Sequence, residues 1–149
     1  MIVRDILIPN DINKEKAIIN DEWWWTKNLI KESERKFKSM NLILDKIGLN
    51  EDNSNDIIEN CYDIIIYLIR AKMLYEGFNA SGRCAHEAEV SYLKTLNFSN
   101  IDLEFMNKLR YFRNGIMYYG RRFDKEYGKM VLEFLNKSRD KLNKLLDIR

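Results

Sequence analysis

The sequence predicts an all-α protein, an antiparallel up-and-down bundle of about five helices in a single domain that spans residues 1–149. Three observations support this prediction. The chain contains one proline and six glycines, so residues that interrupt regular structure are few. Hydrophobic residues make up 46% of the sequence and charged residues 32%, which is typical of a folded globular domain. Between the few breakers, apolar residues recur at helical spacing.

The N-terminal part of the chain predicts a lead-in, residues 1–20, and then a long helix. Pro9 and the polar residues after it precede a short helical stretch, and Asp21 is expected to cap the long helix that follows. Gly48 suits the end of this helix. The apolar stripe along it consists of Trp25, Leu29, Phe37, Met40 and Leu44.

The next segment predicts the central helix of the bundle. It follows an acidic, Asn-rich loop, and Ser54 or Asn55 is expected to cap it. Its interior, DIIIYLIRAKMLY, is apolar on more than one face, as expected of a helix that is covered on several sides. Gly77 is expected to end it.

Three more helices are predicted in the second half of the chain. After a turn at residues 79–83, the third helix is expected to begin at Ser81 or Gly82. A second turn at residues 97–100 precedes the fourth helix, which is expected to close near Gly120. The last helix is predicted within residues 123–148.

Charge, cysteine content and hydropathy bear on the compartment of the protein. The net charge of +2 does not by itself indicate nucleic-acid binding. Two cysteines do not make a disulfide framework, so a reducing compartment is the simplest interpretation. The apolar run at residues 6–8 is much shorter than a signal peptide, and no stretch approaches the ~20 apolar residues that cross a bilayer. We therefore expect a cytoplasmic protein without a membrane-spanning segment.

The segment CAHE groups Cys84, His86 and Glu87 and raises the question of a metal site. The chain has one histidine, and its other cysteine, Cys61, is distant in sequence, so the usual ligands of zinc are too few. We therefore expect no metal, and nothing in the sequence indicates a cofactor. His86 is expected to take a capping or surface role, with a polar contact near a functional site as the alternative.

Three consecutive tryptophans, Trp23, Trp24 and Trp25, lie near the start of the long helix. Consecutive helical residues are ~100° apart, so the three side chains cannot all face one core. At least one is expected to be exposed in an isolated domain or buried against a partner, and tryptophan is enriched at interface hot spots. Two interpretations stay open: a subunit interface, or a helix wedged between two neighbours of its own bundle.

A local cluster of positive charge lies between residues 108 and 125. It has six cations and one carboxylate, a net charge of +5 in a chain whose total is +2. Aromatic residues are interleaved with these cations, and single-stranded nucleic acid favours this combination because cations neutralise phosphates and rings stack on bases. The alternative, favoured by spacing alone, is a solvated helix surface whose rings turn into the core. The cations are Lys108, Arg110, Arg113, Arg121, Arg122 and Lys125, and the rings are Tyr111, Phe112, Tyr118, Tyr119 and Phe123.

Within this cluster, LRYFRNGIMYYG at residues 109–120 resembles the signature of the HEPN family, an arginine and a polar residue, often Asn, followed a few positions later by a histidine. AKMLYEGFNASGRCAHEAEVSYLKTL at residues 71–96 also resembles this family. The resemblance covers most of residues 55–145. It implies a HEPN-like helical bundle that dimerises, and in active members the arginine and histidine of both subunits line a cleft that cuts RNA without a metal.

By this resemblance Arg113 takes the arginine position and Asn114 the polar one, while the histidine position falls on Tyr118. Histidine exchanges protons near neutrality because its unperturbed pKa is ~6.5, whereas tyrosine, with a pKa of ~10, is a poor base at pH 7. Arg113 is still suited to hold a phosphate. We therefore expect a homodimer that binds RNA or a nucleotide at a basic interface cleft, with cleavage weak or absent. Further binding residues are expected to be Arg110, Tyr119, Arg121 and Arg122.

The geometry of this motif raises a difficulty. Arg113 and Tyr118 are five residues apart, roughly 140° around an ideal helix, so they do not share one face. A site that uses both needs a helix bent near Gly115 or two copies of the motif that meet across a twofold axis.

Two other functions stay open. One is a toxin, a metal-independent ribonuclease paired with a nucleotidyltransferase-type antitoxin, in which Tyr118, Tyr119 or His86 takes the role of the histidine. The other is a non-catalytic module for protein interaction or dimerisation.

Overall fold

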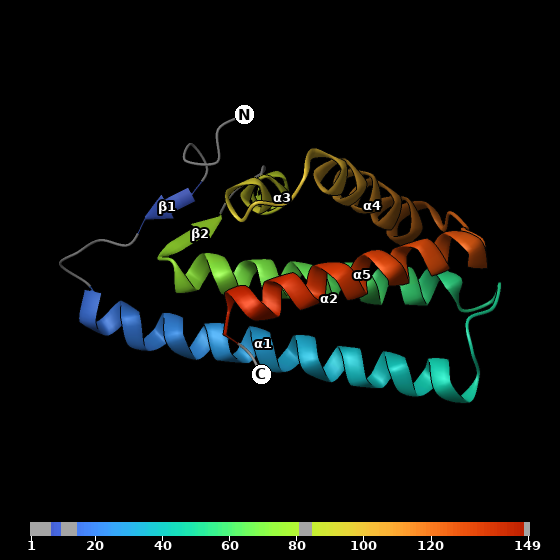
Figure 1. Ribbon diagram of the computed structural model, residues 1–149, viewed down its shortest axis with the longest axis horizontal. Helices are drawn as coiled ribbons and strands as arrows, with labels where there is room; N and C mark the ends of the chain where they lie inside the picture. The colour runs from blue at the N-terminus through green and yellow to red at the C-terminus, as the bar shows by residue number, and fades with distance from the viewer. Residues whose placement is uncertain (1–6, 10–14, 81–84, 148–149) are drawn as a thin grey trace.

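The computed structural model describes the backbone of residues 7–9, 15–80 and 85–147, and the side chains of residues 24–78 and 85–147. Within these ranges the chain forms five helices and two three-residue strands (Figure 1). The prediction of an all-α bundle is confirmed. The helices are α1 (Glu15–Lys46), α2 (Ser54–Tyr75), α3 (Ala85–Thr95), α4 (Asn100–Tyr119) and α5 (Lys125–Leu145), and the strands are β1 (Leu7–Pro9) and β2 (Phe78–Ala80).

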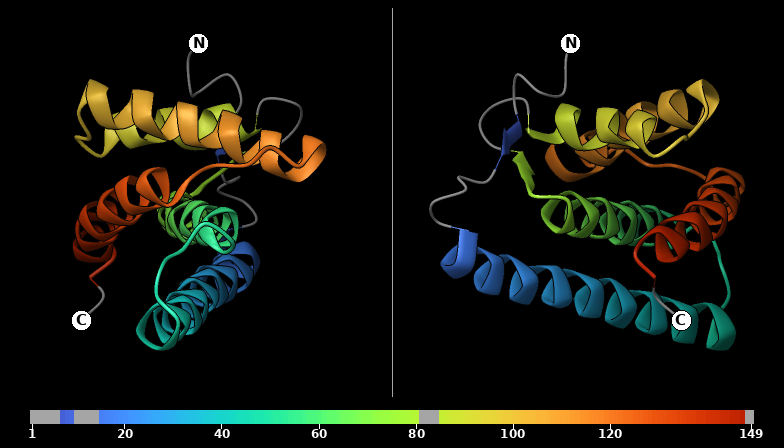
Figure 2. Two further views of the ribbon diagram at one scale, coloured as in Figure 1. Left: turned by 90° about the vertical axis from the view of Figure 1, so that its right-hand side faces the viewer. Right: turned by 60° about the vertical axis from the view of Figure 1, so that its left-hand side comes forward.

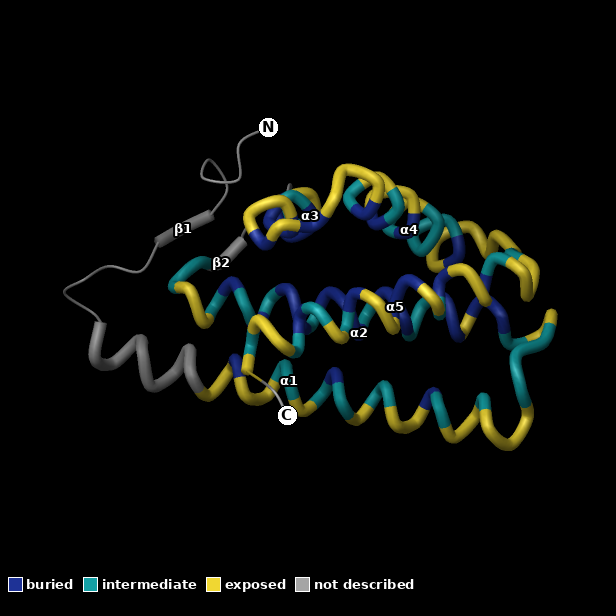
Figure 3. The backbone as a smooth tube through the Cα atoms, in the orientation of Figure 1, coloured by how far each residue is buried: buried dark blue, intermediate teal, exposed yellow. Residues whose placement is uncertain are grey.

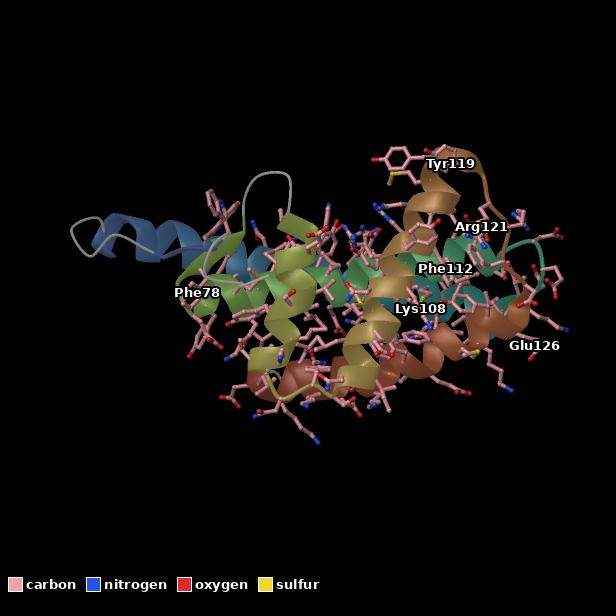
Figure 4. The ribbon with its side chains drawn as sticks, turned by 90° about the horizontal axis from the view of Figure 1, so that it is seen from above. Phe78, Lys108, Phe112, Tyr119, Arg121 and Glu126 are labelled. Carbon is pink, nitrogen blue, oxygen red and sulfur yellow. The ribbon has the colours of Figure 1, made fainter. Side chains whose placement is uncertain are left out.

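Helix α2 is the centre of the bundle, as its apolar interior predicts. Thirteen of its residues are buried, among them Ile57, Ile58, Ile64, Ile65 and Ile69. Helices α1 and α5 lie along α2, whereas α3 and α4 form an antiparallel pair that crosses it (Figure 2; Figure 4). The burial pattern agrees with this arrangement, because α2 is mostly buried and the outer side of α1 is exposed (Figure 3). The core therefore surrounds α2, and the free end of α4 projects from it.

Two helix starts differ from the sequence-based expectation. Helix α1 runs without a break from Glu15, so Asp21 lies inside it and the last part of the predicted lead-in is helical. Residues 15–46 contain neither proline nor glycine, and extending an existing helix is easier than starting a second one. At α2, Ser54 is the first helical residue and Asn53 occupies the cap position without a side-chain cap hydrogen bond. The predicted caps Ser54 and Asn55 instead contact the chain after α4, as described below.

The predicted helix ends are confirmed at three glycines. Gly48, Gly77 and Gly120 all have positive φ values, of 82°, 86° and 63°, which favour glycine at the end of a helix. The predicted start of the third helix at Ser81 or Gly82 lies outside the described residues. The lead-in contributes β1, which pairs antiparallel with β2 in the register Leu7 with Ala80 and Pro9 with Phe78. The sequence did not indicate this pairing, because three-residue strands carry too short a pattern to detect.

Candidate nucleic-acid interface

The C-terminal end of α4 is built around Gly120. Its N–H donates to the carbonyl of Ile116 at 3.1 Å, and the N–H of Arg121 donates to the carbonyl of Gly115 at 3.2 Å. Helix α4 is continuous through Gly115 up to Tyr119, so Gly115 does not interrupt the helix between Arg113 and Tyr118. The chain then reverses toward α5.

The segment after α4 is fixed to the start of α2. The side-chain amide of Asn55, which is buried, donates to the carbonyl of Arg121 at 2.8 Å and accepts from the N–H of Phe123 at 3.0 Å. Ser54 donates to the carbonyl of Phe123. Because one side chain satisfies two backbone groups of this segment, the position of Arg121 is set by α2. The sequence predicts Ser54 or Asn55 as a helix cap, and no local pattern reveals a partner 66 residues away.

The loop between α1 and α2 makes a second attachment. Arg122 donates from Nη2 to the backbone carbonyl of Glu51 at 2.6 Å, and the N–H of Lys125 donates to the Glu51 carboxylate at 3.2 Å. Arg122, which the sequence analysis placed among the binding residues, thus has a structural contact. Its side chain is nevertheless exposed, so its remaining N–H groups can donate to a phosphate.

The aromatic residues of the cluster separate into two groups. Phe112 and Phe123 turn inward and pack on each other, with ring centroids 4.8 Å apart, and both contact Tyr127. The guanidinium of Arg121 lies over both phenylalanine rings, 5.2 Å and 5.1 Å from their centroids. This stacking is a cation–π arrangement that orients Arg121 at the surface.

The three tyrosines of the cluster face solvent. Tyr118 is 70% exposed and Tyr119 is 87% exposed, and Tyr111 is also exposed. Figure 4 shows Tyr119 at the end of α4, beyond the body of the bundle, with Arg121 and Phe112 closer to it. The alternative that all rings of the cluster turn into the core is therefore wrong for these three. Exposed rings beside cations are the surface that stacks with unpaired bases.

Arg113 lies on the opposite side of α4, against α2. Its Nη2 is 3.4 Å from Oδ1 of Asp63, and its guanidinium lies 5.5 Å from the ring centroid of Tyr62. The other oxygen of Asp63 is 3.6 Å from Nζ of Lys36 on α1. The Arg113 side chain is 21% exposed, so it connects α4 to α2 and presents little of its charge to solvent. Asn114 is partly buried.

A junction of ionisable groups surrounds Tyr62, whose hydroxyl is buried without a hydrogen-bond partner among the described residues. Burial in the first place, and the Glu89 carboxylate in the second, raise the pKa of Tyr62 to about 12, although the charges of Arg110 and Arg113 act in the opposite direction. Burial also raises the pKa of Glu59, which the positive charge of Arg113 lowers in part.

Arg110 and His86 connect this junction to α3. Arg110 lies 3.8 Å from the carboxylate of Glu87, and His86 lies 3.5 Å from that of Glu89. These contacts bring α3 beside the basic helix, but they attach the only histidine of the chain to Glu89. Among the described residues, neither Arg110 nor His86 makes a hydrogen bond, an ion pair or a ring contact with Tyr118.

Two of the three tryptophans of the predicted interface are exposed to solvent. Trp24 is 61% exposed and Trp25 is 51% exposed, while the side chain of Trp23 lies outside the described residues. The expectation that at least one of the three is exposed is confirmed. Trp25 lines a surface cavity of about 850 Å³ together with Leu29, Tyr67 and Leu74. The structure does not show what covers this face.

The described part of the chain lacks any group of three His, Cys, Asp or Glu side chains arranged to hold a metal ion, although Cys84 lies outside it. Among the described helices, none combines the length and the apolar character needed to cross a bilayer.

The comparisons with known proteins do not assign a family. A scan against protein-family models found no match, and a search of curated proteins found no similar sequence. The HEPN family therefore stays a prediction that rests on the sequence resemblance alone.

Proposed function

We propose that the protein binds single-stranded RNA at the C-terminal end of α4. The observation that carries the proposal is the exposure of the adjacent rings Tyr118 and Tyr119 beside Arg121. Stacking of a base on an aromatic side chain contributes about 1–3 kcal/mol, and arginines supply the phosphate contacts. The anchored segment after α4 supports the proposal, because a fixed surface loses little entropy when it binds.

The proposal includes a homodimer, which the HEPN resemblance implies. Two copies of the α4 end in one particle would double the local positive charge. Sedimentation at several protein concentrations tests it, and a mass that stays at 17.9 kDa over the range used for RNA binding would remove the dimer from the proposal.

The proposal also includes binding without efficient cleavage. The two residues that the resemblance pairs lie in different environments, Arg113 against Asp63 and Tyr118 in solvent. A tyrosine in water is a weak base at neutral pH. Incubation with a mixed RNA is expected to leave it intact. Cleavage that disappears in Arg113→Ala would instead support the ribonuclease-toxin alternative.

The binding test uses a labelled single-stranded RNA and fluorescence anisotropy at low salt. Replacing both Tyr118 and Tyr119 by alanine is expected to weaken binding about tenfold or more, since each ring stacks with about 1–3 kcal/mol per base. Tyr75→Ala is the control, because Tyr75 is a tyrosine that is 60% exposed on α2 and lies outside the proposed RNA surface. An undetectable interaction of the unmodified protein at low salt, or an equal loss in the control, would overturn the proposal.

A further inference from the structure

A second polar centre lies at the other end of the bundle from Tyr119. A cavity of about 280 Å³ opens between α1, α2, β2 and α3. Figure 4 places Phe78, which lines it, toward the opposite end from Arg121. Its apolar wall includes Leu29, Met73 and Phe78, and its polar residues are Arg70, His86 and Glu89.

Glu89 is the unusual member of this set, because it is a carboxylate that is 4% exposed. Its Oε1 accepts a hydrogen bond from Nε of Arg70 at 2.8 Å. Its Oε2 is buried and has no hydrogen-bond partner among the described residues, and Nδ1 of His86 is 3.5 Å away. A buried carboxylate oxygen without a donor is costly, so a ligand that supplies an N–H would be favoured there.

The charges of the cavity restrict the chemistry of that ligand. Arg70 and Glu89 neutralise each other, so the polar edge favours an uncharged group. It offers one acceptor, Oε2 of Glu89, next to two donor side chains, the guanidinium of Arg70 through its remaining N–H groups and the imidazole of His86. A matching ligand therefore carries an N–H donor beside a carbonyl acceptor on a flat ring. The volume suits one heterocyclic ring system, since pockets for whole drug-sized ligands usually exceed about 300 Å³.

We propose that this cavity binds a keto nucleobase, guanine or uracil, with its ring N–H donating to Glu89 and its carbonyl accepting from Arg70 or His86. Adenine and cytosine lack this ring N–H, so the cavity discriminates against them. Because Oε2 is covered in the structure, binding requires the exposed His86 side chain to turn away, and the ring of Phe78 and the aliphatic walls then enclose the base. Splayed-out bases of single-stranded RNA are recognised through such edges. As a subsite for RNA, this pocket rests on the proposed function of the α4 end.

Free nucleosides test the pocket independently of the α4 end. Chemical-shift perturbation by NMR is followed as guanosine, uridine, adenosine or cytidine is added to the full chain. Guanosine or uridine is expected to bind at least about tenfold more tightly than adenosine and cytidine, because a site built around a hydrogen bond rejects analogues that lack it. Equal binding of all four nucleosides would overturn the proposal. The absence of binding of any of them at about 10 mM would also overturn it.

Variants locate the effect. Glu89→Gln is expected to weaken guanosine binding about tenfold, because a charged acceptor makes the stronger hydrogen bond. Glu133→Gln, an exposed carboxylate on α5, is the control and is expected to bind normally. If Glu89→Gln does not fold, His86→Ala keeps the Arg70–Glu89 pair and leaves Arg70 as the donor to the carbonyl, so the preference for keto bases is expected to persist. Normal guanosine binding in a folded Glu89→Gln, or loss of this preference in His86→Ala, would contradict the assignment.

The two proposed sites can be tested independently of each other. Replacing Tyr118 and Tyr119 is expected to lower RNA affinity for all sequences and to leave guanosine binding unchanged. Loss of nucleoside binding in that double variant would show that the bases bind at α4 and not in this cavity.

Discussion

Two parts of the basic segment lie in opposite environments: Arg113, called here the inward half, and residues 118–121, called the outward half. Arg113 is directed into the bundle, where it contacts Asp63 and lies over Tyr62. Tyr118, Tyr119 and Arg121, in the outward half, reach the surface. The same residue types therefore stabilise the fold in one half and form the candidate binding surface in the other. A local net charge of +5 therefore overstates the charge available to a ligand, because the Asp63 and Glu87 carboxylates and the Glu51 carbonyl already engage part of it.

The anchor between the two halves and α2 should give the largest effect. Asn55→Ala removes two hydrogen bonds to the backbone of Arg121 and Phe123 and leaves these groups without partners. We expect a loss of about 2–3 kcal/mol in the free energy of unfolding, with weaker RNA binding. Urea denaturation measures the loss, and Asn107→Ala, an exposed asparagine on α4, is the control. Full stability of Asn55→Ala would show that the turn after α4 does not depend on α2.

The inward half should contribute to the stability of the fold through the ion pair between Arg113 and Asp63. Arg113→Ala is expected to reduce the free energy of unfolding by about 1–2 kcal/mol, because the partly buried Asp63 loses a partner. A double-mutant cycle with Asp63→Ala should give a coupling energy of about 1 kcal/mol. Arg121→Ala, on the outward half, should lose less than half of what Arg113→Ala loses. Equal losses in the free energy of unfolding for the two arginine variants would contradict the assignment of a structural role to Arg113 and a surface role to Arg121.

The outward half should dominate the salt dependence of RNA binding. Each phosphate contact contributes about 0.7 to the slope of log affinity against log salt for a single strand. Arg121→Ala is expected to reduce this slope by about that amount, whereas Arg113→Ala leaves it nearly unchanged. Anisotropy titrations at several salt concentrations measure both slopes. A larger reduction in Arg113→Ala would place the phosphate on the inward half.

A smaller effect is expected at the boundary between the halves. Gly115 lies within the unbroken helix, and a Cβ added there would meet Cδ of Arg121 at 3.4 Å, an ordinary contact distance with a flexible side chain. Gly115→Ala is expected to raise the free energy of unfolding by about 0.5–1 kcal/mol, because alanine favours helix. Thermal unfolding tests it. If Gly115→Ala is less stable than the unmodified protein, this would support the alternative in which α4 bends at Gly115 so that Arg113 and Tyr118 form one site.

The smallest effect concerns a titration beside the inward half. Burial raises the pKa of Glu59 and the positive charge of Arg113 lowers it in part, so Arg113→Ala should raise this pKa further, while Arg121→Ala should not. A carboxyl whose pKa is higher in the folded state favours folding most while it is protonated. The contribution of Glu59 to stability therefore falls as pH rises from its unfolded pKa through its folded one. NMR titration of the Glu59 side chain checks the direction, and an unchanged pKa in Arg113→Ala would contradict it.

Much of the fold could be predicted from local features of the sequence. The three glycines that end helices have the expected positive φ values, and the apolar interior of α2 marks it as the central helix. The start of α1 was misplaced because Asp21 has the chemistry of a cap although the chain around it favours an uninterrupted helix. The candidate site was predictable in its composition, but the direction of each side chain was not.

The sequence by itself determined an all-α chain, the ends of its helices and a segment in which cations and rings are concentrated. Periodicity and the conformational preferences of glycine act within a few residues, so they can be read locally. Only the tertiary structure decided that Asp63 takes up Arg113, that Asn55 holds the turn after α4, and that Glu89 lies buried beside Arg70 and His86. Except for the His86–Glu89 contact within α3, these contacts join residues that are 19 to 66 positions apart in sequence. Their partners are set by how α2, α3 and α4 pack together, which no local pattern specifies.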